Sequence, residues 1–286
     1  MSGGNMSSNR ISGILRSNHI LSLLLLLLLT VVFGAGCEDF IDATYKYEEP
    51  FSQTIAVKEP GSFSLSNING SITVTSSPAM EVVIKATKHA RWRKEDLDKV
   101  RIEVVGGEKS VIVETVHEKR NLQVKVDYEI TVPENMALEL VKTVNGRVNL
   151  SGKFERAQLR TTNGSITARG EVNWLEAATT NGSLDIIQVK GKVDLKTTNG
   201  SIKLELDEVS ADLNARTTNG SITVRLKNQP DAYFSARTTN GSVRVDYPVT
   251  IEGTITRRRI EGRMGSGQGP RIELHTTNGS ISLMKI

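Results

Sequence analysis

The triplet Asn-Gly-Ser occurs seven times in this chain of 286 residues, and an eighth copy reads Asn-Gly-Arg. From Asn145 onward the asparagines are separated by 18, 18, 18, 20, 21 and 38 residues, so the last interval is about two repeats long. A fixed period of this length is typical of folds that stack one small unit many times. The expected turn residues are Asn69, Gly70, Asn145, Gly146, Asn163, Gly164, Asn181, Gly182, Asn199, Gly200, Asn219, Gly220, Asn240, Gly241, Asn278 and Gly279.

The residues on either side of each Asn-Gly pair alternate between apolar and polar, which predicts β-strands with one buried face. In residues 195–204 the alternation places Leu195, Thr197 and Ile202 inward. The first threonine of each Thr-Thr pair is therefore expected to be buried, and the second exposed. Asn and Gly are expected to form the corner between two strands, because both residues tolerate positive φ.

Two chain paths are compatible with these strands: an antiparallel β meander with a hairpin at every Asn-Gly, and a parallel β-solenoid with a corner there. A hairpin uses Asn-Gly but gives no reason for the identical Thr-Thr that precedes it. In a parallel solenoid, equivalent residues of neighbouring coils lie about 4.8 Å apart, and asparagine side chains can hydrogen-bond in a ladder. We therefore predict an all-β, parallel solenoid of stacked repeats, with the antiparallel meander as the alternative.

The first 36 residues have the features of an export signal. They contain no acidic residue, and Arg10 and Arg16 precede an apolar stretch at 20–33. This stretch has 14 residues, whereas a membrane-spanning helix needs about 20, so cleavage after export is expected. Cys37, the only cysteine, follows directly. The arrangement resembles a bacterial lipoprotein signal, and it predicts that Cys37 is lipidated and anchors the chain in a membrane. An ordinary secreted protein with one thiol is the alternative.

The chain divides into three predicted segments. Residues 1–36 are the signal peptide, 37–50 a lipid-anchored tether, and 51–286 a single β-strand-repeat domain. In the domain, 51–138 reads as irregular strands and 139–286 as regular repeats of about 18–21 residues. Aromatic residues make up 5% of the chain, which favours narrow β-coils over a sandwich built around large rings.

Most of the residues found three positions before a repeat asparagine are basic, and the alternation places them outward. In a parallel stack these side chains form a stripe that could bind anionic polymers, such as surface polysaccharide or lipopolysaccharide phosphates; nucleic acid is not expected as a partner. The alternative is a solvated face whose charges are offset by acids on the following strands, such as Asp185, Glu205 and Asp246. The candidate binding residues are Lys142, Arg160, Lys196, Arg216, Arg237 and His275, and Ala178 interrupts the series.

Other candidate sites are weaker. The arginines at 257–259 lie near several glycines, but no helix pattern follows as a phosphate-binding loop requires; a flexible loop before the last coil is predicted instead. The histidines have no metal-ligand spacing, so no metal, cofactor or catalytic residue is expected. Residues 283–286 are expected to form an uncapped final coil whose edge could pair with another chain, which allows self-association.

The lipoprotein-type leader, the opening copy at 65–74 and the serial Thr-Thr-Asn-Gly-Ser-Ile units together resemble the bacterial putative-adhesin domain family. These are β-strand-repeat envelope proteins related to the head-GIN domains. The resemblance covers about residues 51–286. It implies a right-handed β-solenoid-like fold and a role at the cell surface or envelope, and it brings no catalytic residues to this chain.

The sequence thus predicts a non-catalytic envelope lipoprotein, anchored to the outer membrane or cell surface, whose solenoid is a scaffold or adhesion surface. An anionic polysaccharide or an envelope protein is the expected class of partner. Two alternatives stay open: a carbohydrate-active β-helix lyase or hydrolase, and a regulatory protein that responds to envelope stress through a protein partner.

Overall fold

The computed structural model describes residues 45–119, 122–252 and 255–286, and all of them belong to one compact unit, Asp42–Ile286. The described residues form 22 β-strands and one short 3-10 helix, η1 (Lys94–Asp96). No helix in these ranges is long and apolar enough to span a membrane. The predicted signal peptide and the lipidation site Cys37 lie outside the described residues.

The strands form two faces, because each coil has one strand before its Asn-Gly corner and one after it. The strands before the corner form the threonine sheet, which in spatial order contains β5 (Val100–Gly106), β6 (Ser110–His117), β2 (Ser62–Ser66), β8 (Met136–Asn145), β9 (Val148–Asn163), β11 (Trp174–Asn181), β13 (Lys192–Asn199), β15 (Leu213–Asn219), β21 (Arg271–Asn278), β17 (Ala232–Asn240), β20 (Arg259–Met264) and β19 (Thr250–Ile251).

The strands after the corner form the serine sheet. In spatial order it contains β1 (Tyr47–Ala56), β4 (Glu81–Ala90), β7 (Val124–Pro133), β3 (Ile72–Ser77), the first half of β9, β10 (Ile166–Val172), β12 (Leu184–Ile187), β14 (Ile202–Leu206), β16 (Ile222–Leu226), β22 (Ile281–Lys285) and β18 (Val243–Val245). Strand β9 bends from this sheet into the threonine sheet, so the two faces are continuous.

The repeats stack in parallel and in exact register. Thr179 lies between Thr161 and Thr197 of the two neighbouring coils, and the asparagines pair in the same way. This pairing confirms the predicted parallel solenoid and excludes the antiparallel meander for the repeats. The inward residues of the alternation are buried as expected: Leu195 and Ile202 have 0% exposure. The core between the sheets is therefore built from short alternating side chains, as in other narrow β-coils.

The buried threonines have a specific task at the corner. Each of the repeat threonines donates its Oγ1 hydroxyl to the carbonyl oxygen of a corner glycine in the neighbouring coil, and so satisfies an acceptor that is at least half-buried. Asn67 occupies the same position in the first copy, and its Nδ2 donates to Val126 O at 2.8 Å. The seven Thr-to-Gly bonds, 2.8–3.1 Å long, join Thr143 to Gly70, Thr161 to Gly146, Thr179 to Gly164, Thr197 to Gly182, Thr217 to Gly200, Thr276 to Gly220 and Thr238 to Gly279.

The corner glycines are required for close stacking rather than for positive φ. A Cβ built on Gly164 would lie 1.9 Å from the carbonyl oxygen of Gly146, and the other repeat glycines meet the same obstacle. Among the repeat glycines only Gly70 and Gly279 have positive φ, and none of the repeat asparagines does. The expectation that Asn-Gly serves here as a positive-φ turn is therefore wrong. The backbones of adjacent coils approach so closely at this corner that no side chain fits.

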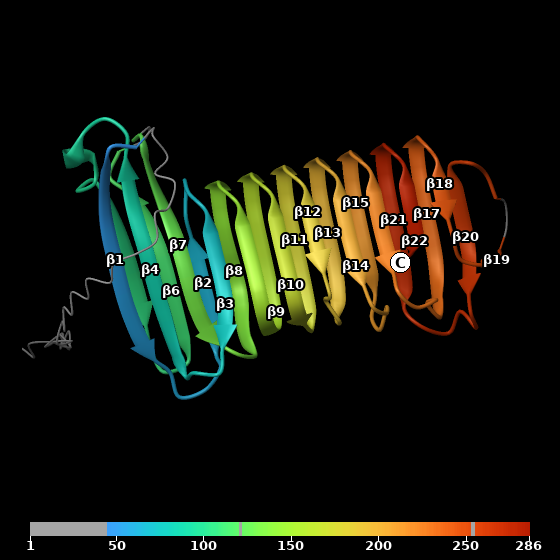
Figure 1. Ribbon diagram of the computed structural model, residues 1–286, viewed down its shortest axis with the longest axis horizontal. Helices are drawn as coiled ribbons and strands as arrows, with labels where there is room; N and C mark the ends of the chain where they lie inside the picture. Colours follow the sequence, from blue (N-terminus) through green and yellow to red (C-terminus); the bar gives the residue numbers. More distant parts are fainter. Residues whose placement is uncertain (1–44, 120–121, 253–254) are drawn as a thin grey trace, which may run out of the picture. The chain divides into compact units, whose positions relative to one another are not determined.

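The coils do not follow one another in sequence order. The last coil, β21 and β22, is inserted between the coil of β15 and β16 and the coil of β17 and β18. Figure 1 shows β21 and β22 between β15 and β17. The first coil, β2 and β3, is likewise inserted between β6 and β7 on one side and β8 and β9 on the other. We expected residues 283–286 to form an uncapped edge; β22 instead has a neighbour on both sides, so this route to self-association is not available.

Antiparallel strands close both sheets at one end of the stack and the threonine sheet at the other. At one end β5 pairs with β6, and β1 and β4 extend the serine sheet beyond β7. At the other end β20 pairs with β17 and β19. Arg259 therefore belongs to a strand, and the expected flexible loop before the last coil is largely a cap. β1 begins at Tyr47, which places the last four residues of the predicted tether in the sheet.

Candidate functional site

The basic stripe predicted from the sequence exists as one column on the outer face of the threonine sheet. Strand pairing places its members opposite one another in neighbouring coils, and His275 lies between Arg216 and Arg237 because the last coil is inserted there. All the charged members are exposed. The cap strand adds Arg259, which lies opposite Arg237. The basic column is thus Lys142, Arg160, Lys196, Arg216, His275, Arg237 and Arg259, with Ala178 between Arg160 and Lys196.

The acids that offset this charge lie two residues away from column positions, on the same or the neighbouring strand. Arg160 Nη2 lies 2.8 Å from Glu176 Oε1, and Arg216 Nη2 lies 3.5 Å from Glu273 Oε2. Arg259 is paired with Glu261 on its own strand. We expected Asp185, Glu205 and Asp246 to have this role. They belong to or follow strands of the serine sheet, and Asp246 pairs with Arg244, so that assignment is wrong.

The neutralisation of the column is partial. Lys142, Lys196 and Arg237 take part in no ion pair within the described ranges. Paired and unpaired cations therefore alternate along the column. Burial opposes ionisation of Glu176, but hydrogen bonds from Gln158 and Arg160 lower the pKa of its carboxyl group. The column carries positive charge where the unpaired cations are exposed, and it remains positive at neutral pH.

A depression of ≈ 690 Å³ lies where the column is interrupted. The short side chain of Ala178 leaves this space open, and Arg160 and Lys196 lie on the two neighbouring coils. Glu176 and Asp194 line the same hollow. The depression thus offers cations on two sides and carboxylate acceptors beside them. This combination suits a ligand that carries both an anionic group and several hydroxyl groups.

A second depression, of ≈ 490 Å³, lies at the opposite corner of the coils. It is lined by the inserted residues that lengthen two repeats, among them Asp207 and Glu208. Lys190 and Glu171 also line it and form an ion pair at 2.6 Å, which lowers the pKa of Glu171 and raises the pKa of Lys190. Of the charged residues that line it, Lys190 and Glu171 therefore offset each other directly. Across the described residues, no group of three metal-ligating side chains is present.

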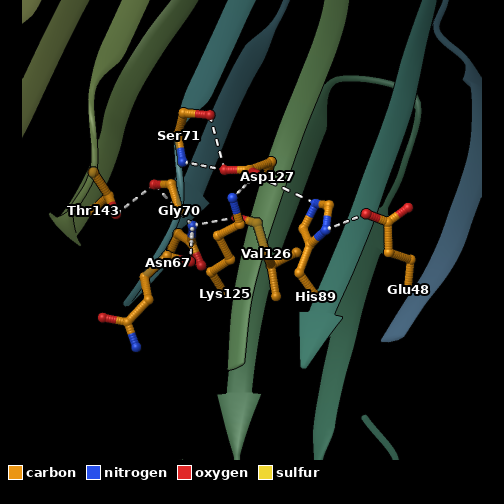
Figure 2. A network of polar contacts seen from close by, with 10 residues as sticks. Glu48, Asn67, Gly70, Ser71, His89, Lys125, Val126, Asp127 and Thr143 are labelled. Atoms are coloured by element: carbon orange, nitrogen blue, oxygen red, sulfur yellow. Dashed lines mark hydrogen bonds and ion pairs between the residues drawn. The ribbon is translucent and has the colours of Figure 1, made fainter. Parts of the chain in front are cut away.

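A polar cluster near the N-terminal cap joins four strands (Figure 2). Asp127 accepts hydrogen bonds from the Ser71 amide at 2.7 Å and the Ser71 hydroxyl at 2.9 Å, and its other oxygen lies 3.3 Å from His89 Nε2. His89 Nδ1 lies 3.0 Å from Glu48 Oε1. Burial opposes ionisation of Asp127, but the bonds from His89 and Ser71 and the nearby Lys125 lower its pKa well below the usual range. We call Glu48, His89, Asp127 and Ser71 the cap clasp.

The cap clasp contains a serine, a histidine and two acids, but not in a catalytic order. A serine nucleophile needs a hydrogen bond to the histidine that accepts its proton. Here the Ser71 hydroxyl donates to the carboxylate of Asp127 instead. The arrangement fixes the strands of the cap and offers no activated nucleophile.

A match to a protein-family model shows which family this chain belongs to. The model of the family described as Toastrack DUF4097 matches residues 130–284, which is more than half of the chain. The chain belongs to the Toastrack DUF4097 family. This membership confirms the family resemblance inferred from the repeats. The Toastrack match begins at β7 and extends to β22, so it covers all the coils with a complete Thr-Thr-Asn-Gly motif.

Solved structures are similar to this Toastrack chain at low identity. A "putative cell adhesion protein" from Clostridium sporogenes is 14% identical with a TM-score of 0.37, over 83% of this chain and 100% of that one. A "putative adhesin" from Bacteroides fragilis is 13% identical with a TM-score of 0.40, over 83% and 97%. A "putative lipid binding protein" from Parabacteroides distasonis is 11% identical with a TM-score of 0.27, over 83% and 96%. A search of curated proteins returned no match.

Some residues of the Toastrack surface were missed from the sequence. Glu176 and Glu273 could have been predicted from the sequence, because each lies two residues before a column position on the outward side of the same strand. No sequence pattern predicts Arg259 as part of the column, because it belongs to an antiparallel cap strand outside the repeats.

Proposed function

We propose that this protein is a non-catalytic envelope lipoprotein whose threonine sheet binds an acidic polysaccharide along the basic column. The observation that carries the proposal is the in-register series of exposed cations, in which Lys142, Lys196 and Arg237 have no acidic partner in the described part of the chain. Exposed charges without partners attract mobile anions and raise their local concentration.

The direction of the column favours a linear polymer. Neighbouring strands of a sheet lie about 4.8 Å apart, so a chain laid across the strands meets a new outward side chain at each coil. That step is of the order of one sugar unit in an extended polysaccharide. A polymer with a carboxylate on each unit would meet several cations at once, and the depression at Ala178 leaves room for one sugar ring. Many weak contacts of this kind add up through effective concentration.

Export and lipid anchoring through Cys37 are part of the same proposal. They are supported by the acid-free leader, its short apolar stretch and the position of the only cysteine. Anchoring at Cys37 would hold the solenoid at a membrane, where envelope polymers are present. A Cys37→Ser variant tests this part: it should move from the membrane fraction to the soluble fraction, and unchanged membrane retention would reject the anchor.

Retention on immobilised polysaccharides tests the binding. The variant Lys142→Gln, Lys196→Gln, Arg237→Gln should bind an acidic polyuronate about tenfold more weakly than the wild type, because each unpaired cation contributes a modest screened attraction. Wild-type binding should fall as salt is added, and a neutral glucan should not be retained. Equal, salt-insensitive retention of the wild type and the triple variant would reject the proposal.

A matched control carries the same loss of charge on the other sheet. Arg169→Gln, Lys203→Gln and Arg225→Gln remove three exposed cations from the serine sheet, and this variant should keep wild-type retention. The same incubations distinguish a carbohydrate-active enzyme, because release of reducing ends or unsaturated products from any polymer would show turnover. If only an envelope protein from native membranes is captured, the polysaccharide proposal fails.

A further inference from the structure

The eight Asn-Gly pairs form one column, and almost all of them have the same two hydrogen bonds. First, the glycine N–H donates to the asparagine main-chain carbonyl of the next coil. These bonds, 2.8–3.0 Å long, join Gly70 to Asn145, Gly146 to Asn163, Gly164 to Asn181, Gly182 to Asn199, Gly200 to Asn219, Gly220 to Asn278 and Gly279 to Asn240.

Second, the asparagine side chains form the predicted ladder. Each Oδ1 accepts a hydrogen bond from the Nδ2 of the next coil. The ladder runs through Asn69, Asn145, Asn163, Asn181, Asn199, Asn219, Asn278 and Asn240, with N···O distances of 2.7–2.9 Å.

Asn240 and Gly241 are the last members of this column, so no further coil accepts from the Gly241 N–H or donates to the Asn240 Oδ1. Within the described residues, the N–H of Gly241 and the Oδ1 of Asn240 have no hydrogen-bond partner. The reason is the cap: β20 pairs with β17 only as far as Arg237 opposite Arg259, and beyond it the carbonyl oxygens of Arg258 and Arg257 accept from the N–H groups of Thr238 and Val243, not from that of Gly241. Asn240 is also exposed to solvent.

This difference matters because Asn-Gly is chemically reactive. The glycine nitrogen, after losing its proton to solvent, attacks the asparagine Cγ, and the side-chain amide leaves as ammonia. A five-membered succinimide forms, and water then opens it at either carbonyl to give aspartate or isoaspartate. Glycine favours the attack because it has no side chain to hinder the approach. The net reaction consumes one water and releases one ammonia.

We propose that Asn240–Gly241 is a site of spontaneous deamidation in the folded protein, and that the fold protects the other seven Asn-Gly pairs. At those seven pairs the attacking N–H is engaged by a carbonyl and the Asn side chain is held in the ladder. Both bonds have to break before the nitrogen can reach Cγ, and a hydrogen bond that is broken without a replacement partner is unfavourable. At Asn240 only its Nδ2 bond to Asn278 Oδ1 has to be lost.

The product would change the end of the stack. An aspartate at position 240 places a carboxylate against the Oδ1 of Asn278, where a donor stood before. An isoaspartate also adds one atom to the main chain between Asn240 and Gly241, which disturbs the corner and the register of β18 with β22. Either product weakens the pairing of the coil of β17 and β18 with the coil of β21 and β22.

Quantitative peptide mapping by mass spectrometry tests the proposal. The folded protein is incubated in mildly alkaline buffer at physiological temperature, and deamidation is followed at each Asn-Gly pair. Asn240 should react about tenfold or more faster than the other sites. Comparable rates at all sites, or a faster reaction at any other Asn-Gly pair, would overturn the proposal.

Two controls separate the fold from the local sequence. In denaturant the seven Asn-Gly-Ser sites share the same reactive triplet, so their rates should converge; a persisting preference for Asn240 would assign the effect to sequence and reject the inference. In the folded protein, Asn240→Gln should abolish the fast release of ammonia. Asn228→Gln, an exposed asparagine outside the column, should leave that release unchanged.

Discussion

Three residues of the Thr-Thr-Asn-Gly-Ser motif each have a structural reason. The first threonine donates to a glycine carbonyl of the preceding coil, the asparagine extends a ladder of amides, and the glycine allows the backbones to approach. The second threonine faces solvent. The motif is therefore copied as a unit because its members act on the equivalent residues of the adjacent coil, as in other cross-strand ladders.

The two threonines of one pair allow a matched test at the residue scale. Thr197→Val removes the donor to the half-buried carbonyl of Gly182, so the free energy of unfolding should fall by about 1 kcal/mol. Thr198→Val, one residue later on the exposed side, should change it by less than about 0.5 kcal/mol. Urea unfolding measures both. Equal losses for the two variants would show that the hydroxyl of Thr197 is not needed at the corner.

The corner glycines give a second residue-scale prediction. In Gly182→Ala the new Cβ would lie 1.9 Å from the carbonyl oxygen of Gly164. The coils have to separate, and we expect a loss of about 3 kcal/mol in the free energy of unfolding. Gly107→Ala is the control, because its nearest atom would be 4.0 Å from the Cβ. A Gly182→Ala protein as stable as Gly107→Ala would contradict the close approach.

The cap clasp shows how single elements are joined outside the repeats. Glu48 is on β1, His89 on β4 and Asp127 on β7, and Ser71 directly precedes β3. The clasp thus links the antiparallel cap to the first inserted coil (Figure 2). Its bonds are made by the ionised carboxylate of Asp127, so its contribution depends on pH.

The sign of this pH dependence follows from the lowered pKa of Asp127. An unfolded aspartate titrates near pH 4, and the folded group titrates lower. The clasp therefore stabilises the fold fully above about pH 4, and this stabilisation is lost as the pH falls towards the pKa of the folded state. Asp127→Asn should cost about 2 kcal/mol at neutral pH, and the difference from wild type should shrink in acid. A difference that grows as the pH falls would contradict this assignment.

The whole stack is interlocked at both ends, because a coil from each end of the repeat series lies inside it. A solenoid built in sequence order loses only its terminal unit when the last repeat is removed. Here the last coil separates β15 and β16 from β17 and β18. The contacts of this coil also join residues distant in sequence, which slows folding. The end of the chain therefore completes the stack after its neighbours have been made.

Truncation after Pro270 tests this order. Without β21 and β22, residues 232–245 lose their parallel neighbours, and their amide hydrogens should lose protection from exchange. Residues 166–187, in the middle of the regular stack, should keep their protection. If residues 232–245 stay protected, β17 has paired directly with β15, and the inserted coil is not required for that end of the stack.

The sequence by itself determined the unit of this fold. The period, the alternation and the identical Thr-Thr-Asn-Gly-Ser copies were sufficient to predict parallel coils, the buried first threonine, the asparagine ladder and the basic column from Lys142 to Arg237. Each of these depends only on a strand period and on like residues lying over like residues. The acidic partners Glu176 and Glu273 follow the same alternation and could have been predicted from it.

The order in which the coils are stacked could not be predicted from the repeats. Asn219 could have been followed by Asn240 or by Asn278, because both copies present the same motif to their neighbour and the local energies are nearly equal. The choice depends on residues 246–270, where β19 and β20 form a cap on β17 and return the chain to a place inside the stack. That contact joins segments with no repeat pattern, so no local sequence rule predicts it, yet it leaves Asn240 at the end of the ladder.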